Sequence, residues 1–222
     1  PALSKNKCLK IPHFSAKFGP HQHLPRAIMQ RIVLGSGSPY RKRLLPRLGL
    51  EFECLSPDID ETPASGEPPE TLVLRLSEAK ARAVALRAPD ALVIASDQVG
   101  ATDGRLLGKP GTVERAQQQL RGISGREVRF LTGLCVLDAP SGRLLSGVET
   151  CTVRLRELSD VAIRDYVRRE QPLDCAGSFK VEGLGIALFR SLELDDPTVL
   201  EGLPLIRLVE FLERFGVAVL QH

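Results

Sequence analysis

Strand-like and helix-like segments alternate along the early half of this chain, and this alternation constrains the fold more than any other feature. Apolar runs typical of strands occupy residues 31–34, 52–56, 91–96, 128–137 and 144–155. Helical periodicity occupies residues 40–48, 70–86, 113–122, 160–170 and 204–215. The alternation in the early half implies parallel pairing of its strands. The last two strands are separated only by residues 139–142, which predicts an antiparallel hairpin. We therefore expect a single α/β domain, with a mixed, twisted sheet flanked by helices and a cleft at the carboxyl ends of its strands.

The turn after the first predicted strand has the composition of an anion-binding site. It reads Gly35-Ser36-Gly37-Ser38, and Pro39 then suits a first helical turn that carries Arg41, Lys42 and Arg43. Backbone N–H groups, hydroxyls and a helix N-terminus all favour a bound anion. The stretch matches neither the Walker loop nor the dinucleotide fingerprint. An ordinary strand-to-helix turn with a solvated basic helix start is the alternative, and this stretch alone does not decide between them.

Several kinds of catalysis lack the residues they need. The four histidines are His13, His21, His23 and His222, so residues 24–221 have no histidine for a Ser-His-Asp or Cys-His mechanism. The five cysteines are dispersed without a C-x-x-C pair, which argues against zinc and is typical of reduced thiols in a cytoplasmic protein. Carboxylates, lysines, arginines and hydroxyls remain. With a divalent cation such as Mg²⁺ or Mn²⁺, these groups suit the chemistry of phosphate esters and anhydrides.

The first 28 residues differ from the rest of the chain in charge. They contain five of the chain's cations and no acid, and removing these cations from the net charge of +3 leaves the remainder at −2. We therefore expect no nucleic-acid partner, and no membrane partner because no apolar run approaches about 20 residues. The only methionine is Met29. We expect residues 1–28 to be an N-terminal extension, either disordered or artificially added, and residues 29–222 to form the domain.

Two groups of carboxylates fall where the predicted cleft opens. Asp97 follows the buried strand, where α/β folds often place catalytic groups, although it could instead only cap the next turn. Asp58, Asp60 and Glu61 follow the second strand. Clustered acids repel one another unless a cation lies among them, so this cluster indicates a metal site or, alternatively, a solvated loop.

Three lysines are candidates to meet an anionic substrate in the same cleft. Lys80 lies on the predicted helix 70–86, where it could reach the cleft or merely cover the helix face. Lys109 lies on the constrained turn Gly108-Lys109-Pro110, and Lys180 lies with Glu182 in a glycine-flanked segment. Each of these signals is weak by itself.

Taken in order, short motifs along the chain resemble the Maf-like nucleoside triphosphate pyrophosphatases. The motifs are Ser36-Gly37-Ser38-Pro39-Tyr40-Arg41, Asp60-Glu61-Thr62-Pro63, Glu78-Ala79-Lys80-Ala81, Ser96-Asp97-Gln98-Val99, Gly108-Lys109-Pro110, Cys175-Ala176-Gly177-Ser178-Phe179 and Gly202-Leu203-Pro204. The resemblance covers about residues 31–217 and implies a fold akin to the inosine triphosphate pyrophosphatases. It also implies a metal-dependent reaction that splits a nucleoside triphosphate into the monophosphate and pyrophosphate.

The resemblance assigns roles to particular residues. It makes Asp97 the proton acceptor, and we expect Glu61 to be its partner carboxylate and the two to hold the metal. We expect the triphosphate to be bound by the side chains of Ser36, Ser38, Arg41, Lys80, Lys109 and Lys180. Lys42 and Arg43 follow on other helix faces, so we leave them out of the site. The resemblance leaves open whether the protein forms a homodimer.

Three positions indicate the subgroup and therefore the base. The pyrimidine-preferring subgroup, which takes dTTP and UTP, usually reads Ser-Pro-Arg-Arg and Ala-Asp-Thr, with a later glutamine. Tyr40, Gln98 and Glu182 instead resemble the 7-methyl-GTP pyrophosphatase subgroup, which usually has tryptophan at the position of Tyr40. The methylated ring is cationic, so it favours an aromatic face, and a carboxylate accepts hydrogen bonds from guanine N–H groups.

Other functions stay open on the sequence alone. The chain could be a pyrophosphatase of the dTTP/UTP type, or a regulator that binds a nucleotide without hydrolysing it. It could also be a metal-dependent phosphatase that acts on monophosphates. The product distinguishes them, because a pure binder releases none and a phosphatase releases orthophosphate in place of pyrophosphate.

Overall fold

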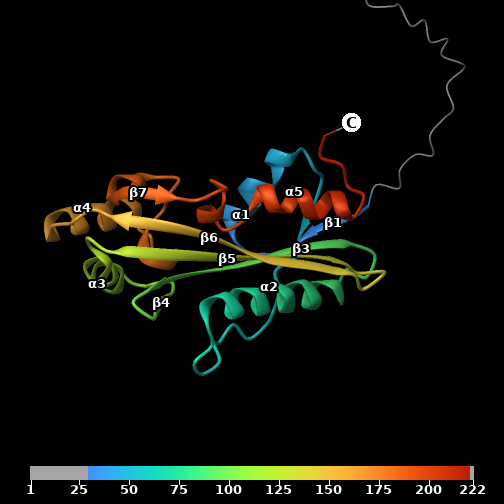
Figure 1. Ribbon diagram of the computed structural model, residues 1–222, viewed down its shortest axis with the longest axis horizontal. Coiled ribbons are helices and arrows are strands. Elements are labelled where there is room, and N and C mark those ends of the chain that lie inside the picture. The colour runs from blue at the N-terminus through green and yellow to red at the C-terminus, as the bar shows by residue number, and fades with distance from the viewer. Residues whose placement is uncertain (1–29, 221–222) are drawn as a thin grey trace, which may run out of the picture.

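Seven strands form one mixed sheet in the computed structural model, which describes residues 30–220 (Figure 1). The strands are β1 Ile32–Leu34, β2 Glu53–Cys54, β3 Leu92–Thr102, β4 Arg105–Leu107, β5 Glu127–Asp138, β6 Leu144–Leu155 and β7 Phe189–Glu193. Their order across the sheet is β2-β1-β3-β5-β6-β7, with β4 paired to β3. Strand β1 is parallel to β2 and β3, and the remaining pairs are antiparallel. The predicted mixed α/β domain is confirmed, and so is the β5–β6 hairpin.

Five α-helices and four short 3₁₀ helices accompany the sheet in residues 30–220. The α-helices are α1 Pro39–Leu44, α2 Pro69–Ala85, α3 Val113–Ile123, α4 Asp160–Glu170 and α5 Leu205–Arg214. The 3₁₀ helices are η1 Leu45–Leu48, η2 Ala176–Ser178, η3 Leu184–Leu188 and η4 Val199–Glu201. Helix α2 covers one face of the sheet, α1 and α5 lie on the opposite face, and α3 and α4 lie at the far end with β7 (Figure 1).

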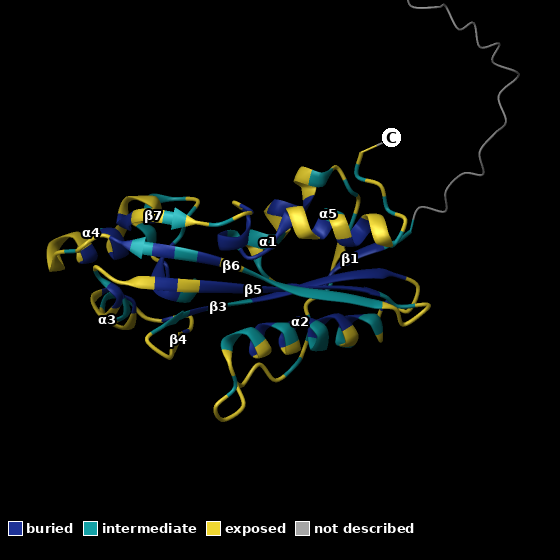
Figure 2. Cartoon of the chain, in the orientation of Figure 1, coloured by how far each residue is buried: buried dark blue, intermediate teal, exposed yellow. Residues whose placement is uncertain are grey.

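Alternating side chains of the central strands build a core on each face of the sheet. On β3, Leu92 and Ile94 pack with α5, whereas Val93 and Ala95 pack with α2. Both faces are covered, so β3 reads as a continuous apolar run instead of an alternating one. Figure 2 shows this buried band along β3 and β5. The same alternation sends Asp97 toward α2 and its neighbour Gln98 toward η4.

Helix α2 lies unusually close to the sheet at Gly133 of β5. A Cβ atom there would lie 2.3 Å from the carbonyl oxygen of Val73 on α2, so only glycine fits. Gly133 is the register partner of Asp97 on the neighbouring strand β3. The close approach therefore holds α2, and with it Lys80, against the part of the sheet that carries Asp97.

The predicted elements differ from the observed ones in a few places. The strands β4 and β7 were not predicted, and the helix predicted over residues 40–48 is split into α1 and η1. The split falls between Leu44 and Leu45, just before Pro46, which has no N–H to continue the α-helical hydrogen bonds. The predicted extension 1–28 and the domain start at Met29 lie outside the described residues. Within residues 30–220, no helix combines the length and apolar composition needed to cross a membrane.

Candidate active site

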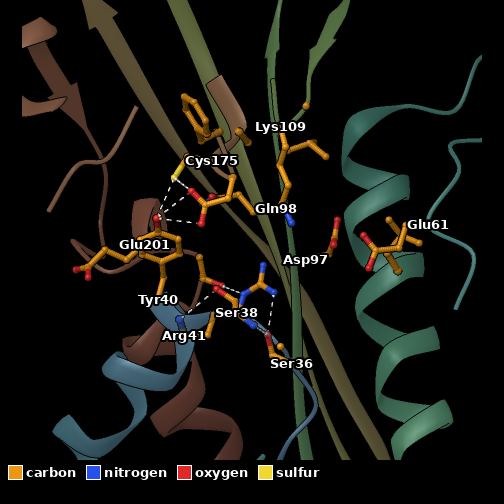
Figure 3. A pocket seen from close by; sticks show the side chains of 18 of the residues that line it. Ser36, Ser38, Tyr40, Arg41, Glu61, Asp97, Gln98, Lys109, Cys175 and Glu201 are labelled. Carbon is orange, nitrogen blue, oxygen red and sulfur yellow. Dashed lines mark hydrogen bonds between the residues drawn. The ribbon is translucent and has the colours of Figure 1, made fainter. Parts of the chain in front are cut away.

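A cleft of about 670 Å³ opens beyond the carboxyl end of β1, between α2 on one side and the η4 segment on the other (Figure 3). This volume is within the range typical of small-molecule sites. Ten of the eleven predicted site residues line it: Ser36, Ser38, Tyr40, Arg41, Glu61, Lys80, Asp97, Gln98, Lys109 and Glu182. Predicted site residues up to 146 positions apart in sequence, Ser36 and Glu182, therefore line one cavity.

Two carboxylates share one buried ammonium group at the α2 side of the cleft. Lys80 Nζ lies 2.5 Å from Asp97 Oδ1 and 2.9 Å from Glu61 Oε1. The side chains of Lys80 and Asp97 are only 6% and 9% exposed, whereas that of Glu61 is 55% exposed. Lys80 therefore orients Asp97 through one oxygen, and Asp97 Oδ2 remains for a ligand or water in the cleft.

Asp97 lies inside a strand, although the sequence analysis placed it just after one. Strand β3 continues to Thr102 because the antiparallel partner β5 pairs with it as far as Ala101. Its parallel neighbour β1 stops earlier, at Leu34, opposite Ile94. Asp97 thus lies three residues beyond the end of the parallel pairing, and this places its side chain at the cleft.

The turn between β1 and α1 brings Ser36, Ser38 and Arg41 together. Ser38 is the N-cap of α1, and its Oγ accepts a hydrogen bond from the Arg41 N–H. Ser36 Oγ accepts from Ser38 N at 3.1 Å and from Arg41 Nη1 at 3.3 Å. The hydroxyl hydrogen of the buried Ser36 remains available to an acceptor in the cleft.

Arg41 is a cation without a salt-bridge partner among residues 30–220. Its Nε donates to the carbonyl oxygen of Gly202 at 2.7 Å, and the guanidinium lines the cleft. Loss of water around the guanidinium lowers the pKa of Arg41 from its usual value, while the negative charges of Asp97 and Glu61 act in the opposite direction. A desolvated guanidinium that faces a cavity indicates an anionic ligand.

The η4 segment is fixed so that its last turn presents Gly202 to Arg41. Gly202 has φ +92°, a left-handed conformation that favours glycine, and its carbonyl also accepts from Ser96 Oγ at 2.8 Å. The buried Asp196 accepts from the backbone N–H of Thr198 and of Ile206, both at 2.7 Å. Asp196 therefore has a structural role, which is to join this loop to the start of α5.

Tyr40 lies at the end of the cleft that is farther from α2 (Figure 3). The Tyr40 hydroxyl donates to the Asp174 carboxylate at 3.2 Å, and the Cys175 thiol donates to the Tyr40 oxygen at 3.3 Å. Burial and the bond with Cys175 raise the pKa of Tyr40, so this phenol is neutral. Burial raises the pKa of Cys175 to about 11, so its thiol is protonated near neutral pH and is a poor nucleophile.

Two glutamates, Glu182 and Glu201, also line this end of the cleft. Burial raises the pKa of Glu201, and the nearby negative charge of Glu182 raises it further. Glu182 is partly compensated from outside the cleft by Arg43, whose Nη2 lies 3.5 Å from Glu182 Oε1. The end of the cleft around Tyr40 is thus lined by acids, whereas the remainder is lined by the cations Arg41, Lys80 and Lys109 together with the carboxylates Asp97 and Glu61.

The remaining predicted residues occupy different positions. Gln98 Nε2 donates to the Val199 carbonyl at 2.6 Å and to Thr132 Oγ1 at 2.9 Å, so the amide is held in place at the cleft wall. Lys109 is exposed at the rim. Lys180 is the one predicted site residue that does not line the cleft. Its ammonium donates instead to the Glu170 carbonyl at 2.9 Å, at the end of α4.

The carboxylates suit a cation that binds together with a phosphate group. Residues 30–220 contain no group of three or more His, Cys, Asp or Glu side chains arranged to hold a metal ion. Asp97 and Glu61 nevertheless approach each other closely enough to share Lys80. Mg²⁺ is usually bound by one or two carboxylates plus substrate phosphates, and this donor set has that character.

Sequence reasoning missed three titratable residues that line the cleft. Asp174 and Glu201 carried no pattern that set them apart, and Cys175 was quoted within a motif without a role. Glu201 directly precedes the Gly202-Leu203-Pro204 motif, which is the only signal that could have pointed to it. Their placement depends on the η2 and η4 segments, which lack the periodicity that sequence patterns report.

Comparison with known proteins identifies relatives along nearly the whole described chain. A family model described as "Maf-like protein" matches residues 31–215. A protein of Nitrosococcus oceani named "7-methyl-GTP pyrophosphatase" is 54% identical over 198 residues, which cover 89% of this chain and 100% of that protein. A Pseudomonas aeruginosa protein with the same name is 56% identical over 191 residues, which cover 86% of this chain and 100% of that protein. Among solved structures, the Staphylococcus aureus Ham1 protein is 16% identical, with a TM-score of 0.47, and 84% of this chain and 100% of that one are covered.

Proposed function

Because this chain belongs to the family of Maf-like proteins, we propose that its cleft hydrolyses a nucleoside triphosphate to the monophosphate and pyrophosphate, with 7-methyl-GTP as the preferred substrate. Relatives at 52–56% identity that bear the name 7-methyl-GTP pyrophosphatase support the substrate. The distribution of charge in the cleft supports the orientation, with the triphosphate near Arg41 and Lys80 and the base near Tyr40.

The observation that carries the proposal is the cation Arg41, which is desolvated and has no salt-bridge partner among the described residues. Two bonds, to Gly202 and Ser36, fix its planar guanidinium, so a phosphate that binds there meets donors already in position. Ser36 and the N-terminal turn of α1 add neighbouring donors. Lys109 at the rim adds a further positive charge to the cleft.

Asp97 is positioned to activate the attacking water. Its Oδ1 is held by Lys80, which leaves Oδ2 to accept a proton from a water molecule that attacks the α-phosphorus. Lys80 and Arg41 offset the charge that develops on the phosphate oxygens, and pyrophosphate departs with the electron pair of the broken bond. A divalent metal such as Mg²⁺ or Mn²⁺, held by Asp97 and Glu61, would lower the barrier further by polarising the phosphate.

The base end of the cleft suits a cationic purine. The aromatic ring of Tyr40 attracts a positively charged ring, and the carboxylate of Glu182 accepts from the N1–H and exocyclic amine of guanine. Methylation makes the ring cationic and its N1–H more acidic, so both contacts strengthen. A pyrimidine lacks the paired donors and leaves the carboxylate without partners, which costs affinity.

Product analysis with the wild-type protein tests this proposal. The protein is incubated with 7-methyl-GTP and Mg²⁺ or Mn²⁺, and the products are separated by ion-exchange chromatography. We expect equal amounts of 7-methyl-GMP and pyrophosphate, and we expect the reaction to stop when a chelator removes the metal. Orthophosphate with 7-methyl-GDP, or binding without any product, would refute the proposal.

A further inference from the structure

Arg43 contacts both side chains that the proposed function gives to the base. Its guanidinium carbon lies 5.0 Å from the centre of the Tyr40 ring, which is the geometry of a cation–π contact. Its Nη2 also lies 3.5 Å from Glu182 Oε1. The guanidinium is planar, cationic and bears N–H donors, so it makes the two contacts expected of a methylated guanine ring.

The acids around Arg43 outnumber the cations that reach them. Asp174, Glu182 and Glu201 line the base end of the cleft, and Arg43 and Arg47 act on Glu201 from outside it. Lys180 lies nearby in sequence, but its ammonium is bonded to the Glu170 carbonyl. Within the described chain, Arg43 is therefore the cation that contacts a base-end acid, Glu182, directly, and its side chain is 62% exposed.

We propose that Arg43 is a specificity-determining residue, a cation outside the cleft whose charge acts on the bound base through its contacts with Tyr40 and Glu182. This inference rests on the proposed function. A neutral guanine that contacts Tyr40 and Glu182 inside the cleft has no net charge for Arg43 to repel. A cationic 7-methylguanine makes the same contacts and is also repelled by the nearby guanidinium.

Removal of the Arg43 charge should therefore favour the cationic base over the neutral one. In Arg43→Gln, either base can still contact Tyr40 and Glu182, but only the methylated ring gains from the loss of repulsion. A unit charge within about 10 Å, near a protein surface, supports an increase of about five- to tenfold in the preference for 7-methyl-GTP over GTP. The gain should appear in KM, while kcat stays within about twofold, because the base end is remote from the reacting phosphate.

The test measures kcat and KM for 7-methyl-GTP and for GTP at mildly acidic pH, where N1 of the methylated ring keeps its proton. Arg43→Lys retains the charge and should leave the preference near the wild-type value. Lys42→Gln removes one charge from the neighbouring position of α1, which is exposed, and should leave the preference unchanged. Added salt should shrink the difference between wild type and Arg43→Gln.

Several results would overturn the role of Arg43. An unchanged or lower preference in Arg43→Gln would do so, as would an equal rise in Lys42→Gln or in Arg43→Lys. A change confined to kcat would also contradict it, because a base contact acts on binding. These outcomes differ from a failure of the proposed function, in which the wild-type protein itself releases no pyrophosphate from 7-methyl-GTP.

Discussion

Replacement of Asp97 by asparagine is expected to lower kcat by on the order of 10² or more, while nucleotide binding largely survives. Asparagine keeps the shape of the side chain but cannot accept the proton of the attacking water, and it removes one charge from the pair proposed to hold the metal. Lys80 keeps Glu61 as a partner, so the buried ammonium is not left without a carboxylate. The measurement is kcat and KM by pyrophosphate release, together with the dissociation constant of a non-hydrolysable nucleotide analogue.

Asp58 provides a matched control for this substitution. It is exposed, belongs to the same acidic loop as Glu61 and does not line the cleft, so Asp58→Asn should retain wild-type turnover. Thermal unfolding of both variants establishes that each is folded. Near-normal turnover in a folded Asp97→Asn protein would remove Asp97 from its role as the proton acceptor.

Arg41→Gln is expected to reduce kcat/KM by about 10², which corresponds to the loss of about 3 kcal/mol of charge-assisted hydrogen bonding to phosphate. Glutamine has a neutral amide in place of the guanidinium and cannot contact Gly202, Ser36 and a phosphate oxygen together. The kcat/KM of Arg41→Lys should lie between those of the wild type and Arg41→Gln, because lysine retains the charge but lacks the planar arrangement of donors. Steady-state kinetics on 7-methyl-GTP measure the effect.

Binding of the free nucleoside shows whether Arg41→Gln loses activity because a phosphate contact is lost or because the whole cleft is disturbed. 7-Methylguanosine has no phosphate, so its affinity should be the same for wild type and Arg41→Gln if Arg41 acts only on the triphosphate. A parallel loss of nucleoside affinity would mean that the substitution disturbs the whole cleft. Wild-type kcat/KM in Arg41→Gln would contradict the placement of the triphosphate beside this residue.

The parts of the fold that follow from periodicity were predictable from the sequence. The strands β3, β5 and β6 are long apolar runs, and α2 has a regular pattern of buried positions such as Leu72, Leu76 and Lys80. The three residues of β1 were predictable because they form an apolar run, whereas β4 and β7 contain Arg105 and Arg190 and form no such run. The continuation of β3 past Asp97 depends on pairing with β5, which is a tertiary effect.

The candidate site was predictable for residues that belong to sequence motifs. It was not predictable for long side chains that can contact more than one partner. The charges of Arg43 and Lys180 are evident in the sequence, but their directions are not. Lys180 was expected in the cleft and instead contacts the end of α4, whereas Arg43 was left out and contacts Tyr40 and Glu182. A long flexible side chain reaches several acceptors, and only the folded surroundings determine which one it contacts.

The division of charge along the cleft is the basis for the proposed selectivity. Arg41 and Lys80 at one end suit three phosphates, while Asp174, Glu182 and Glu201 around Tyr40 suit a positively charged base. A neutral purine satisfies the first requirement only. The cleft is therefore expected to discriminate among nucleotides by the charge of the base as well as by its hydrogen-bonding edge.

A competition experiment tests this claim most directly. The wild-type protein is given an equimolar mixture of 7-methyl-GTP, GTP, UTP and dTTP with Mg²⁺ or Mn²⁺, and the disappearance of each triphosphate is followed by chromatography while pyrophosphate is measured. We predict that 7-methyl-GTP is consumed first, with one pyrophosphate released for each 7-methyl-GMP formed. Earlier consumption of UTP or dTTP, or equal consumption of all four nucleotides, would contradict it.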